Sequence, residues 1–193
     1  MADPADAVAR VFEALRAGRL TRDDLTARRL AAFLGQSTIG LYHHFGSLDG
    51  FLIRVDGAGW RLLFETLARR DAGGASAGDL AVEYLDFAFR HPHLYWLMGE
   101  RPFDRAALRR EGRLALGKPL WAAFLALLER HGSCRPALDA RALLGGLHGL
   151  AALTLSGRAN FGEVPRRPEE LAREAARRLA EALLGPGGGP VSS

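Results

Sequence analysis

The stretch from residue 25 to residue 52, LTARRLAAFLGQSTIGLYHHFGSLDGFL, most constrains the fold because it divides into helices at fixed points. Thr26 can cap one helix and Ser37 the next, since a hydroxyl oxygen can accept a hydrogen bond from a free N–H at a helix start. Gly35 lies between them and suits the left-handed turn that ends a helix. Ser47 is placed to cap a third helix. The stretch predicts two short helices, a glycine turn between them, and a longer helix.

The apolar residues of this stretch recur at helical spacing. Leu30, Phe33 and Leu34 share one face of the first helix, and Leu41 and Phe45 form the inward face of the second. The residues left facing outward on the second helix are Thr38, Ile39, Gly40, Tyr42, His43 and His44. Two such helices form a helix-turn-helix, whose second helix is the right width for the DNA major groove. On spacing alone, an ordinary helical hairpin is an equal alternative.

The rest of the chain also has helical character. Glycine and proline fall mostly between segments of helical periodicity, and strand-like alternation is absent, so an all-α fold is expected. The helix-turn-helix falls in residues 1–52, and we expect a connecting helix over 47–70 and a helical body in 71–184. Further helices are predicted over 3–17, 79–91, 93–98, 114–130, 138–155 and 168–184. Residues 185–193 are predicted to be a disordered tail.

The charge distribution sets a condition on any DNA-binding role. The net charge is +4, with 25 Arg and a single Lys, and a basic balance suits a nucleic-acid partner. Residues 1–52, however, carry six Arg and six Asp or Glu. The basic excess lies later, at Arg101, Arg105, Arg109, Arg110, Arg113 and Lys118. Affinity for phosphates must then come from the local placement of side chains, helix N-termini and hydroxyls. We expect weaker non-specific binding than a lysine-rich DNA-binding domain would give.

Composition also bears on location. No apolar run is long enough to span a bilayer, and a signal-peptide pattern is absent. Cys134 is the single cysteine, so no internal disulfide can form and a reducing compartment is favoured. We therefore expect a cytoplasmic protein without membrane association.

Residues 25–52 resemble the DNA-binding segment of the tetracycline-repressor (TetR) family. The family pattern runs Leu-Thr, a basic residue, Leu-Ala, Leu-Gly, Leu-Tyr, His-Phe, and Ser-Lys followed by an apolar pair. The matching positions here are Leu25-Thr26, Arg28-Arg29, Leu30-Ala31, Leu34-Gly35, Leu41-Tyr42, His44-Phe45, Ser47 and Phe51-Leu52. Leu48 stands where the family usually has lysine, so one expected phosphate contact is missing.

The resemblance implies an architecture and partners. It implies that residues 1–52 form an N-terminal three-helix helix-turn-helix DNA-binding domain. It also implies that residues 71–184 form a C-terminal helical bundle that binds a small-molecule effector and dimerises. It also implies a homodimer, joined by a four-helix bundle to which each chain contributes two helices, here 138–155 and 168–184. The alternative is that these two helices only close the core of one chain. The expected partners are double-stranded DNA with a palindromic operator, a second copy of the chain, and an unidentified effector.

The resemblance also implies roles for individual residues of the DNA-binding domain, residues 1–52, which is called the head below. Arg28 is the expected base reader, because a guanidinium can bind guanine O6 and N7 through two hydrogen bonds. Ile39 could pack on a thymine methyl group, and His43 could also reach base edges. Tyr42, His44 and Thr26 are expected to hold phosphates, which positions the DNA-binding domain without reading sequence. The full predicted DNA-binding set is Thr26, Ala27, Arg28, Thr38, Ile39, Tyr42, His43 and His44. The alternative for the arginines is a solvated helix face.

A ligand pocket is predicted in the second half, where aromatic residues concentrate. Ligand sites in helical bundles lie between helices and are mostly apolar with a few polar groups. The predicted ligand-binding set is Trp60, Phe64, Tyr84, Phe87, Trp96, Trp121, Phe124 and His148. Taken singly, each aromatic side chain fits a core role as well. No phosphate-binding glycine loop, nucleophile elbow or metal-ligand spacing appears, so we expect neither an enzyme, a cofactor nor a metal site.

The sequence therefore predicts an all-α, homodimeric transcriptional regulator, a repressor that leaves its operator when an effector binds. One alternative is a ligand-independent regulator. Another is a helical protein-interaction module that keeps the helix-turn-helix shape without binding DNA, which the neutral head and Leu48 would suit. The operator, the effector, the regulated genes and the choice between repression and activation stay open.

Overall fold

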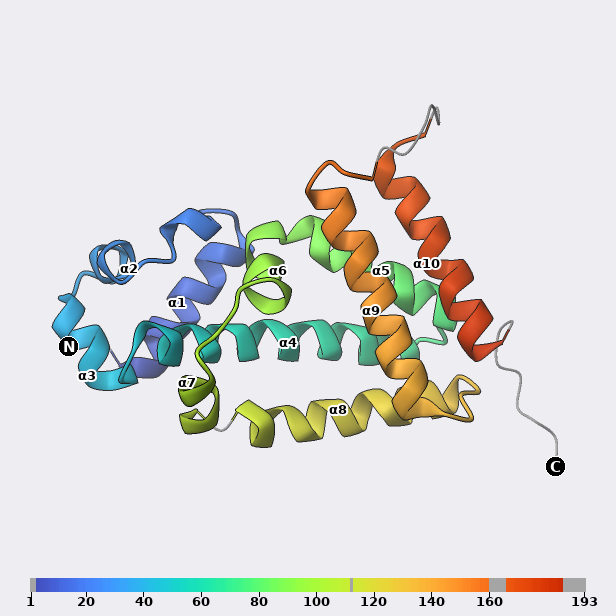
Figure 1. Ribbon diagram of the computed structural model, residues 1–193, viewed down its shortest axis with the longest axis horizontal. Helices are drawn as coiled ribbons and strands as arrows, with labels where there is room; N and C mark the ends of the chain where they lie inside the picture. Colours follow the sequence, from blue (N-terminus) through green and yellow to red (C-terminus); the bar gives the residue numbers. More distant parts are fainter. Residues whose placement is uncertain (1–2, 112, 160–165, 186–193) are drawn as a thin grey trace. The chain divides into compact units, whose positions relative to one another are not determined.

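The computed structural model describes residues 3–111, 113–159 and 166–185. All regular structure in these ranges is helical, which confirms the all-α prediction (Figure 1). The elements are α1 (Pro4–Arg16), the 3-10 helix η1 (Arg22–Asp24), α2 (Ala27–Leu34), α3 (Thr38–Phe45), α4 (Leu48–Ala72), α5 (Ala77–Arg90), α6 (Pro92–Gly99), α7 (Arg105–Arg110), α8 (Arg113–Arg130), α9 (Pro136–Leu155) and α10 (Pro168–Leu184). The predicted tail lies outside the described residues beyond Gly185.

The chain forms two compact units, each built from two separate stretches. Unit 1 comprises Met1–Leu62 and His91–Pro119, and unit 2 comprises Leu63–Arg90 and Leu120–Ser193, as far as these are described. Helices α4 and α8 each run from one unit into the other. Residues 91–119, which were expected in the C-terminal domain, belong in the structure to the same unit as the N-terminal helices.

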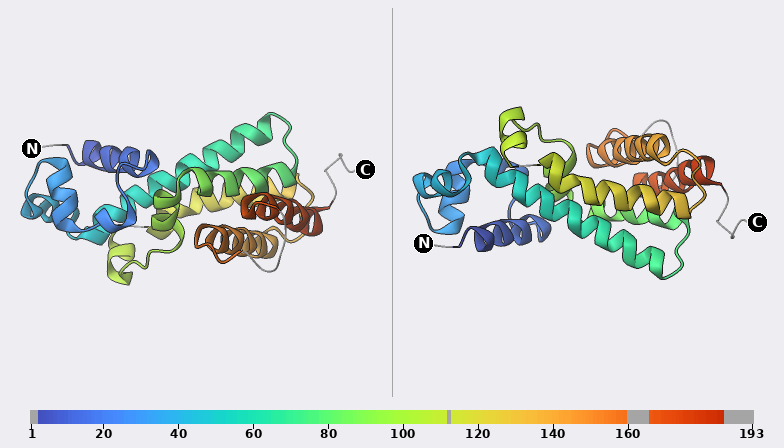
Figure 2. Two further views of the ribbon diagram at one scale, coloured as in Figure 1. Left: turned by 90° about the horizontal axis from the view of Figure 1, so that it is seen from above. Right: turned by 90° about the horizontal axis from the view of Figure 1, so that it is seen from below.

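Unit 1 has a core shared by the helix-turn-helix and α6. Helix α6 packs against α1 and η1, and Figure 2 shows α1, α2 and α3 gathered at the N-terminal part of α4. His91, at the start of α6, donates from Nδ1 to the carbonyl oxygen of Arg16 at 2.9 Å. The largest fully buried side chains of this unit are Leu15, Leu30, Leu41, Phe51, Leu52, Ile53, Leu94, Tyr95 and Leu97. Burying each one contributes roughly 1.5–3 kcal/mol, so the unit has a substantial core.

Unit 2 is organised around α10, which packs on both α5 and α9. Small residues at helical spacing make this close packing possible, because Ala172, Ala176 and Ala180 are buried on one face of α10. Gly146 of α9 faces Leu179, where an added methyl group would overlap the leucine side chain. Among the described residues, no helix is long and apolar enough to cross a membrane.

Candidate functional site

The turn between α2 and α3 has the geometry that the sequence predicted. Gly35 takes a left-handed conformation with φ of 70°, which costs a glycine nothing sterically. The N–H of Gln36 then donates to the carbonyl oxygen of Ala31 at 3.0 Å and closes the end of α2. Ser37 opens α3, since its Oγ accepts from the N–H of Gly40 at 3.1 Å. The two helices of the motif therefore meet at a fixed angle.

Helix α3 has one buried and one exposed face. Leu41 and Phe45 are buried against the rest of unit 1, and Phe45 packs edge-on against Phe51 with ring centroids 4.8 Å apart. On the other face, Ile39 is 79% exposed and Tyr42 is 45% exposed. An aliphatic side chain this exposed at the start of a short helix is available for contact with another molecule.

The two adjacent arginines of α2 differ in their availability. Arg29 donates from Nη1 to Asp24 Oδ1 at 2.8 Å and to the carbonyl oxygen of Asp23 at 3.3 Å. Arg28 is also exposed, and it has no hydrogen bond or ion pair within the described part of the chain. Its guanidinium is thus free to meet a ligand, whereas that of Arg29 is already engaged.

Asp24 is held in its charged form by neighbours in the same loop. Hydrogen bonds from the backbone N–H and the hydroxyl of Thr21, both 2.8 Å long, lower the pKa of the Asp24 carboxyl, and Arg29 adds to the effect. The carboxylate that restrains Arg29 therefore stays ionised at neutral pH.

The remaining predicted DNA-binding residues occupy the same surface with different exposure. Thr26 is exposed, and its Oγ accepts from the N–H of Arg29 at 3.4 Å, which leaves the hydroxyl proton for another acceptor. Ala27 and Thr38 are half-buried, and His43 is exposed. His44 is half-buried, and its Nε2 atom is buried without a hydrogen-bond partner among the described residues, so that atom is not presented to a phosphate.

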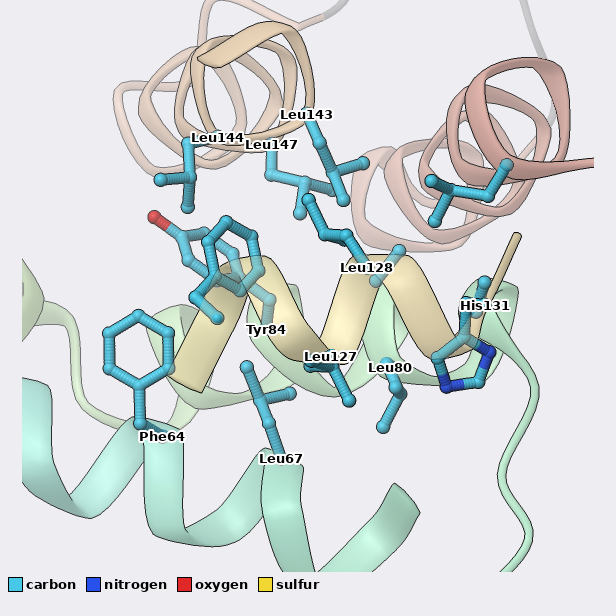
Figure 3. Close-up of a pocket in the computed structure, with 14 residues that line it drawn as sticks. Phe64, Leu67, Leu80, Tyr84, Leu127, Leu128, His131, Leu143, Leu144 and Leu147 are labelled. Atoms are coloured by element: carbon cyan, nitrogen blue, oxygen red, sulfur yellow. The ribbon is translucent and has the colours of Figure 1, made fainter. Parts of the chain in front are cut away.

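Unit 2 contains an apolar cavity between α4, α5, α8, α9 and α10. Its volume is about 30 Å³, enough for one water molecule, and about 430 Å³ of empty space lies among the lining side chains when its open mouth is included. Figure 3 shows leucines of α9 opposite Phe64 and Leu67 of α4. The lining residues are Phe64, Leu67, Ala77, Leu80, Ala81, Tyr84, Phe124, Leu127, Leu128, His131, Leu143, Leu144, Leu147 and Leu184.

His131, which lines this cavity, is bonded to an ion pair outside the lining. His131 Nε2 lies 2.8 Å from Asp71 Oδ1, and Arg130 Nη2 lies 2.7 Å from Asp71 Oδ2. Partial burial works to raise the pKa of Asp71, but the hydrogen bonds from Arg130 and His131 outweigh it and hold the pKa below its usual value. The network therefore holds the imidazole of His131 in place, and His131 and Tyr84 are the two polar residues of an otherwise hydrophobic lining.

The predicted ligand-binding residues do not all meet at this cavity. Phe64, Tyr84 and Phe124 line it, and the rings of Phe64 and Phe124 have centroids 5.6 Å apart. Trp121 packs against Phe124 and carries Arg141 over its ring, outside the lining. Three further residues are also absent from the lining: Phe87 is buried in unit 2, and Trp60 and Trp96 belong to unit 1. His148, predicted as a polar group, does not line it either.

The leucines and His131, which form most of the lining, were not among the predicted ligand-binding residues. Their signal is present in the helical period, because Leu127 and Leu128 of α8 lie four and three residues before His131, which directly follows the helix. Leu143, Leu144 and Leu147 follow the same rule on α9. Aromatic content alone identified only Phe64, Tyr84 and Phe124 of the lining. Within the described ranges, no group of three or more His, Cys, Asp or Glu side chains could hold a metal ion.

Comparison with protein families identifies the second half of the chain. Residues 78–179, more than half of the 193 residues, match the family described as the tetracyclin repressor-like C-terminal domain. The chain belongs to the TetR family. A comparison with individual curated proteins gave no match.

TetR family membership gives the coarse function. TetR family proteins are transcriptional regulators and not enzymes, in agreement with the sequence-based prediction. The matched segment contains α6 and α7, which the structure groups with the N-terminal helices. Part of the TetR-like regulatory domain therefore packs directly on the unit that carries the helix-turn-helix.

Proposed function

We propose that this TetR family protein is a homodimeric repressor that binds a palindromic operator and leaves it when a small molecule binds. The observation that carries the proposal is the exposed face of α3, with Ile39 and Tyr42 projecting outward on a helix fixed by its buried face. On such a helix, Ile39 would present its aliphatic side chain to the major groove, where a thymine methyl group is a suitable contact.

The proposed DNA contacts divide into reading and positioning. Arg28, which is exposed and unpaired within the described residues, is assigned to a guanine. Ile39 and His43 are assigned to other base edges in the major groove. Tyr42 and the Thr26 hydroxyl are assigned to phosphates, which fix the register of the helix on DNA without reading sequence. Ala27, Thr38 and His44 remain in the proposed contact set, His44 through a ring atom other than Nε2.

The dimer is proposed to form through α9 and α10. One face of α9 combines exposure with small or apolar residues: Leu138, Ala142, Gly145, Gly149 and Leu153. Leu138 is 58% exposed, and added methyl groups at Gly145 and Gly149 would meet no atom. Such a face allows close approach of a second helix. A sedimentation mass of a single chain at micromolar concentration would contradict the dimer.

The effector is proposed to be an uncharged, largely hydrophobic molecule with one hydrogen-bonding group. The cavity offers leucine and aromatic side chains, with His131 at one side and Tyr84 as the other polar residue. A charged ligand would lose its hydration there without an opposite charge exposed to it. The cavity of about 30 Å³ must widen to hold such a molecule, so the effector would favour a more open arrangement of the lining helices.

Two helices could transmit the effect of effector binding from the cavity to the DNA-binding unit. Helices α4 and α8 both contribute to the cavity lining, through Phe64 and Leu127 among others, and both continue into unit 1. A displacement of either helix at the cavity would be transmitted to the DNA-binding unit. In a dimer, the two recognition helices must lie about 34–36 Å apart to meet successive major grooves. A change in this spacing lowers DNA affinity.

The decisive test is selection from a pool of random duplexes. We expect enrichment of a palindrome whose half-sites are about 10 base pairs apart, or a multiple of one helical turn. Binding to the selected duplex would then weaken on addition of a compound found by thermal-shift screening of uncharged hydrophobic molecules. No enrichment of any sequence would favour the protein-interaction alternative, and enrichment without any stabilising compound would favour a ligand-independent regulator.

A further inference from the structure

We propose that α7 is a second phosphate-binding element, which contacts the DNA backbone through Arg105, Arg109 and Arg110 beside the recognition helix. The inference rests on the DNA-binding function proposed above and adds a contact surface outside the helix-turn-helix. It concerns a segment about 60 residues later in the chain, within the part that matches the regulatory domain.

Positive charge is concentrated in the segment around α7 and not in the helix-turn-helix. A protein binds the DNA backbone by neutralising phosphates with Arg and Lys side chains, and this term supplies most of the sequence-independent affinity. Residues 1–52 have equal numbers of basic and acidic residues, and Leu48 replaces the lysine expected after Ser47. Residues 101–118 carry six basic and two acidic side chains. The positive charge missing from the head is therefore supplied by this segment.

The position of α7 within unit 1 brings it close to the recognition helix. Arg110 donates from Nη2 to Ser47 Oγ at 3.3 Å, and Ser47 in turn caps α4 by accepting from the N–H of Gly50 at 2.9 Å. The Nε atom of Arg110 lies 3.9 Å from the place where a Cβ of Gly46 would stand. Gly46 and Ser47 join α3 to α4, and Figure 1 shows α7 beside this end of α4. The guanidinium thus lies next to the end of the recognition helix.

Two of the carboxylates near α7, those of Asp49 and Glu111, are already paired with arginines. Asp49 pairs with Arg101 at 2.7 Å, and Glu111 pairs with Arg54 at 2.8 Å. These pairs fix the segment around α7 onto α4. Asp104 accepts from the N–H of Ala107 at 2.8 Å and caps α7. The surplus left at the surface is positive.

The arginine side chains of α7 are available to bind phosphates. All three arginines are exposed, and none of them forms an ion pair within the described residues. Arg105 and Arg109 are four residues apart and share one face of α7. A guanidinium with free N–H groups binds a phosphate through two parallel hydrogen bonds. Three such groups on a rigid support beside α3 suit a DNA strand that continues past the major-groove contact.

The test compares the wild-type protein with an R105Q/R109Q/R110Q variant on the selected duplex and on random duplex, across a salt series. We expect affinity on the order of tenfold lower for both duplexes, and a slope of log affinity against log salt shallower by about two to three. The matched control is R16Q, which removes one arginine from α1 of the same unit, where it pairs with Glu13. Its affinity should stay within about twofold of wild type.

Two further variants guard against indirect effects. R105Q/R109Q removes only side chains without a hydrogen bond among the described residues, so its thermal unfolding should match wild type while its salt slope still falls. L48K in the triple variant should restore part of the slope by placing a cation at the same junction. A triple variant with wild-type affinity and slope would overturn the α7 proposal alone. A wild-type protein that binds no duplex would overturn it together with the proposed function.

Discussion

The Asp49 carboxylate, in the first turn of α4, lies 2.7 Å from Arg101 and thereby ties the helix-turn-helix to the chain that follows α6. Its second oxygen accepts from the N–H of Asp104 at 2.7 Å. Both side chains are largely buried, with 20% and 15% exposure. A segment of the matched regulatory domain is thus fixed to the element that directly follows the recognition helix.

Loss of this pair should destabilise unit 1. D49A leaves the Arg101 guanidinium largely buried without its carboxylate, and we expect a loss of about 1–3 kcal/mol in the free energy of unfolding. The control is E13A, which breaks the Glu13–Arg16 pair on the exposed face of α1 and should change stability by less than about 0.5 kcal/mol. Chemical denaturation measures both. Equal effects of the two substitutions would contradict the structural role of Asp49.

Two glycines of α4 should respond oppositely to replacement by alanine. A Cβ at Gly50 would overlap the carbonyl oxygen of Phe45, so G50A must displace backbone at the end of α3 and should cost about 1–3 kcal/mol. A Cβ at Gly57 would meet only Arg61 Nη1, at 3.8 Å. G57A should therefore stabilise the protein by about 0.5–1 kcal/mol, the usual difference between the two residues inside a helix. A calorimetric comparison in which G50A unfolds at or above the wild-type temperature would refute the close contact.

The loss of folding stability at acid pH should depend on Asp71. Because the folded-state pKa of Asp71 is below 3.8, its bonds to Arg130 and His131 stabilise the protein above that value, and this contribution is lost as the pH falls through the folded-state pKa. D71N should be less stable than wild type near pH 6 by about 1–3 kcal/mol. The difference should shrink steadily below pH 4. A constant difference from pH 6 to pH 2.5 would show that the charge of Asp71 is irrelevant.

Substitutions of the two neighbouring arginines of α2 should distinguish the reading of a base from a general contribution of positive charge to DNA affinity. R28A should lose about 1–3 kcal/mol of affinity for the selected duplex and relax one base position, with little effect on random duplex. R29A should affect both duplexes alike and more weakly, because Arg29 is already held by Asp24. Competition binding on single-base variants of the operator distinguishes them. Identical specificity profiles for R28A and wild type would remove Arg28 from the base-reading set.

The parts of this fold that sequence predicts well are local. The caps Thr26 and Ser37, the turn at Gly35 and the helical period depend on residues within one or two turns of each other. Each predicted helix accordingly has a counterpart in the structure.

Long-range packing accounts for what the sequence did not predict. The attachment of residues 91–119 to the N-terminal helices depends on contacts such as Asp49–Arg101 and His91–Arg16. No local sequence pattern predicts these contacts. The cavity is lined mainly by leucines, because the facing registers of five helices decide which side chains meet. The difference between Arg28 and Arg29 likewise depends on which of them Asp24 reaches.

The most direct test of the account is the DNA affinity of a T38A/I39A/H43A variant, which removes outward side chains of α3 and leaves its buried face unchanged. Thermal unfolding should match wild type, because Ile39 and His43 are exposed and Thr38 is half-buried. We predict that affinity for the selected duplex falls at least about a hundredfold, to the level of random duplex. Wild-type affinity in a correctly folded variant would contradict the assignment of α3 as the recognition helix.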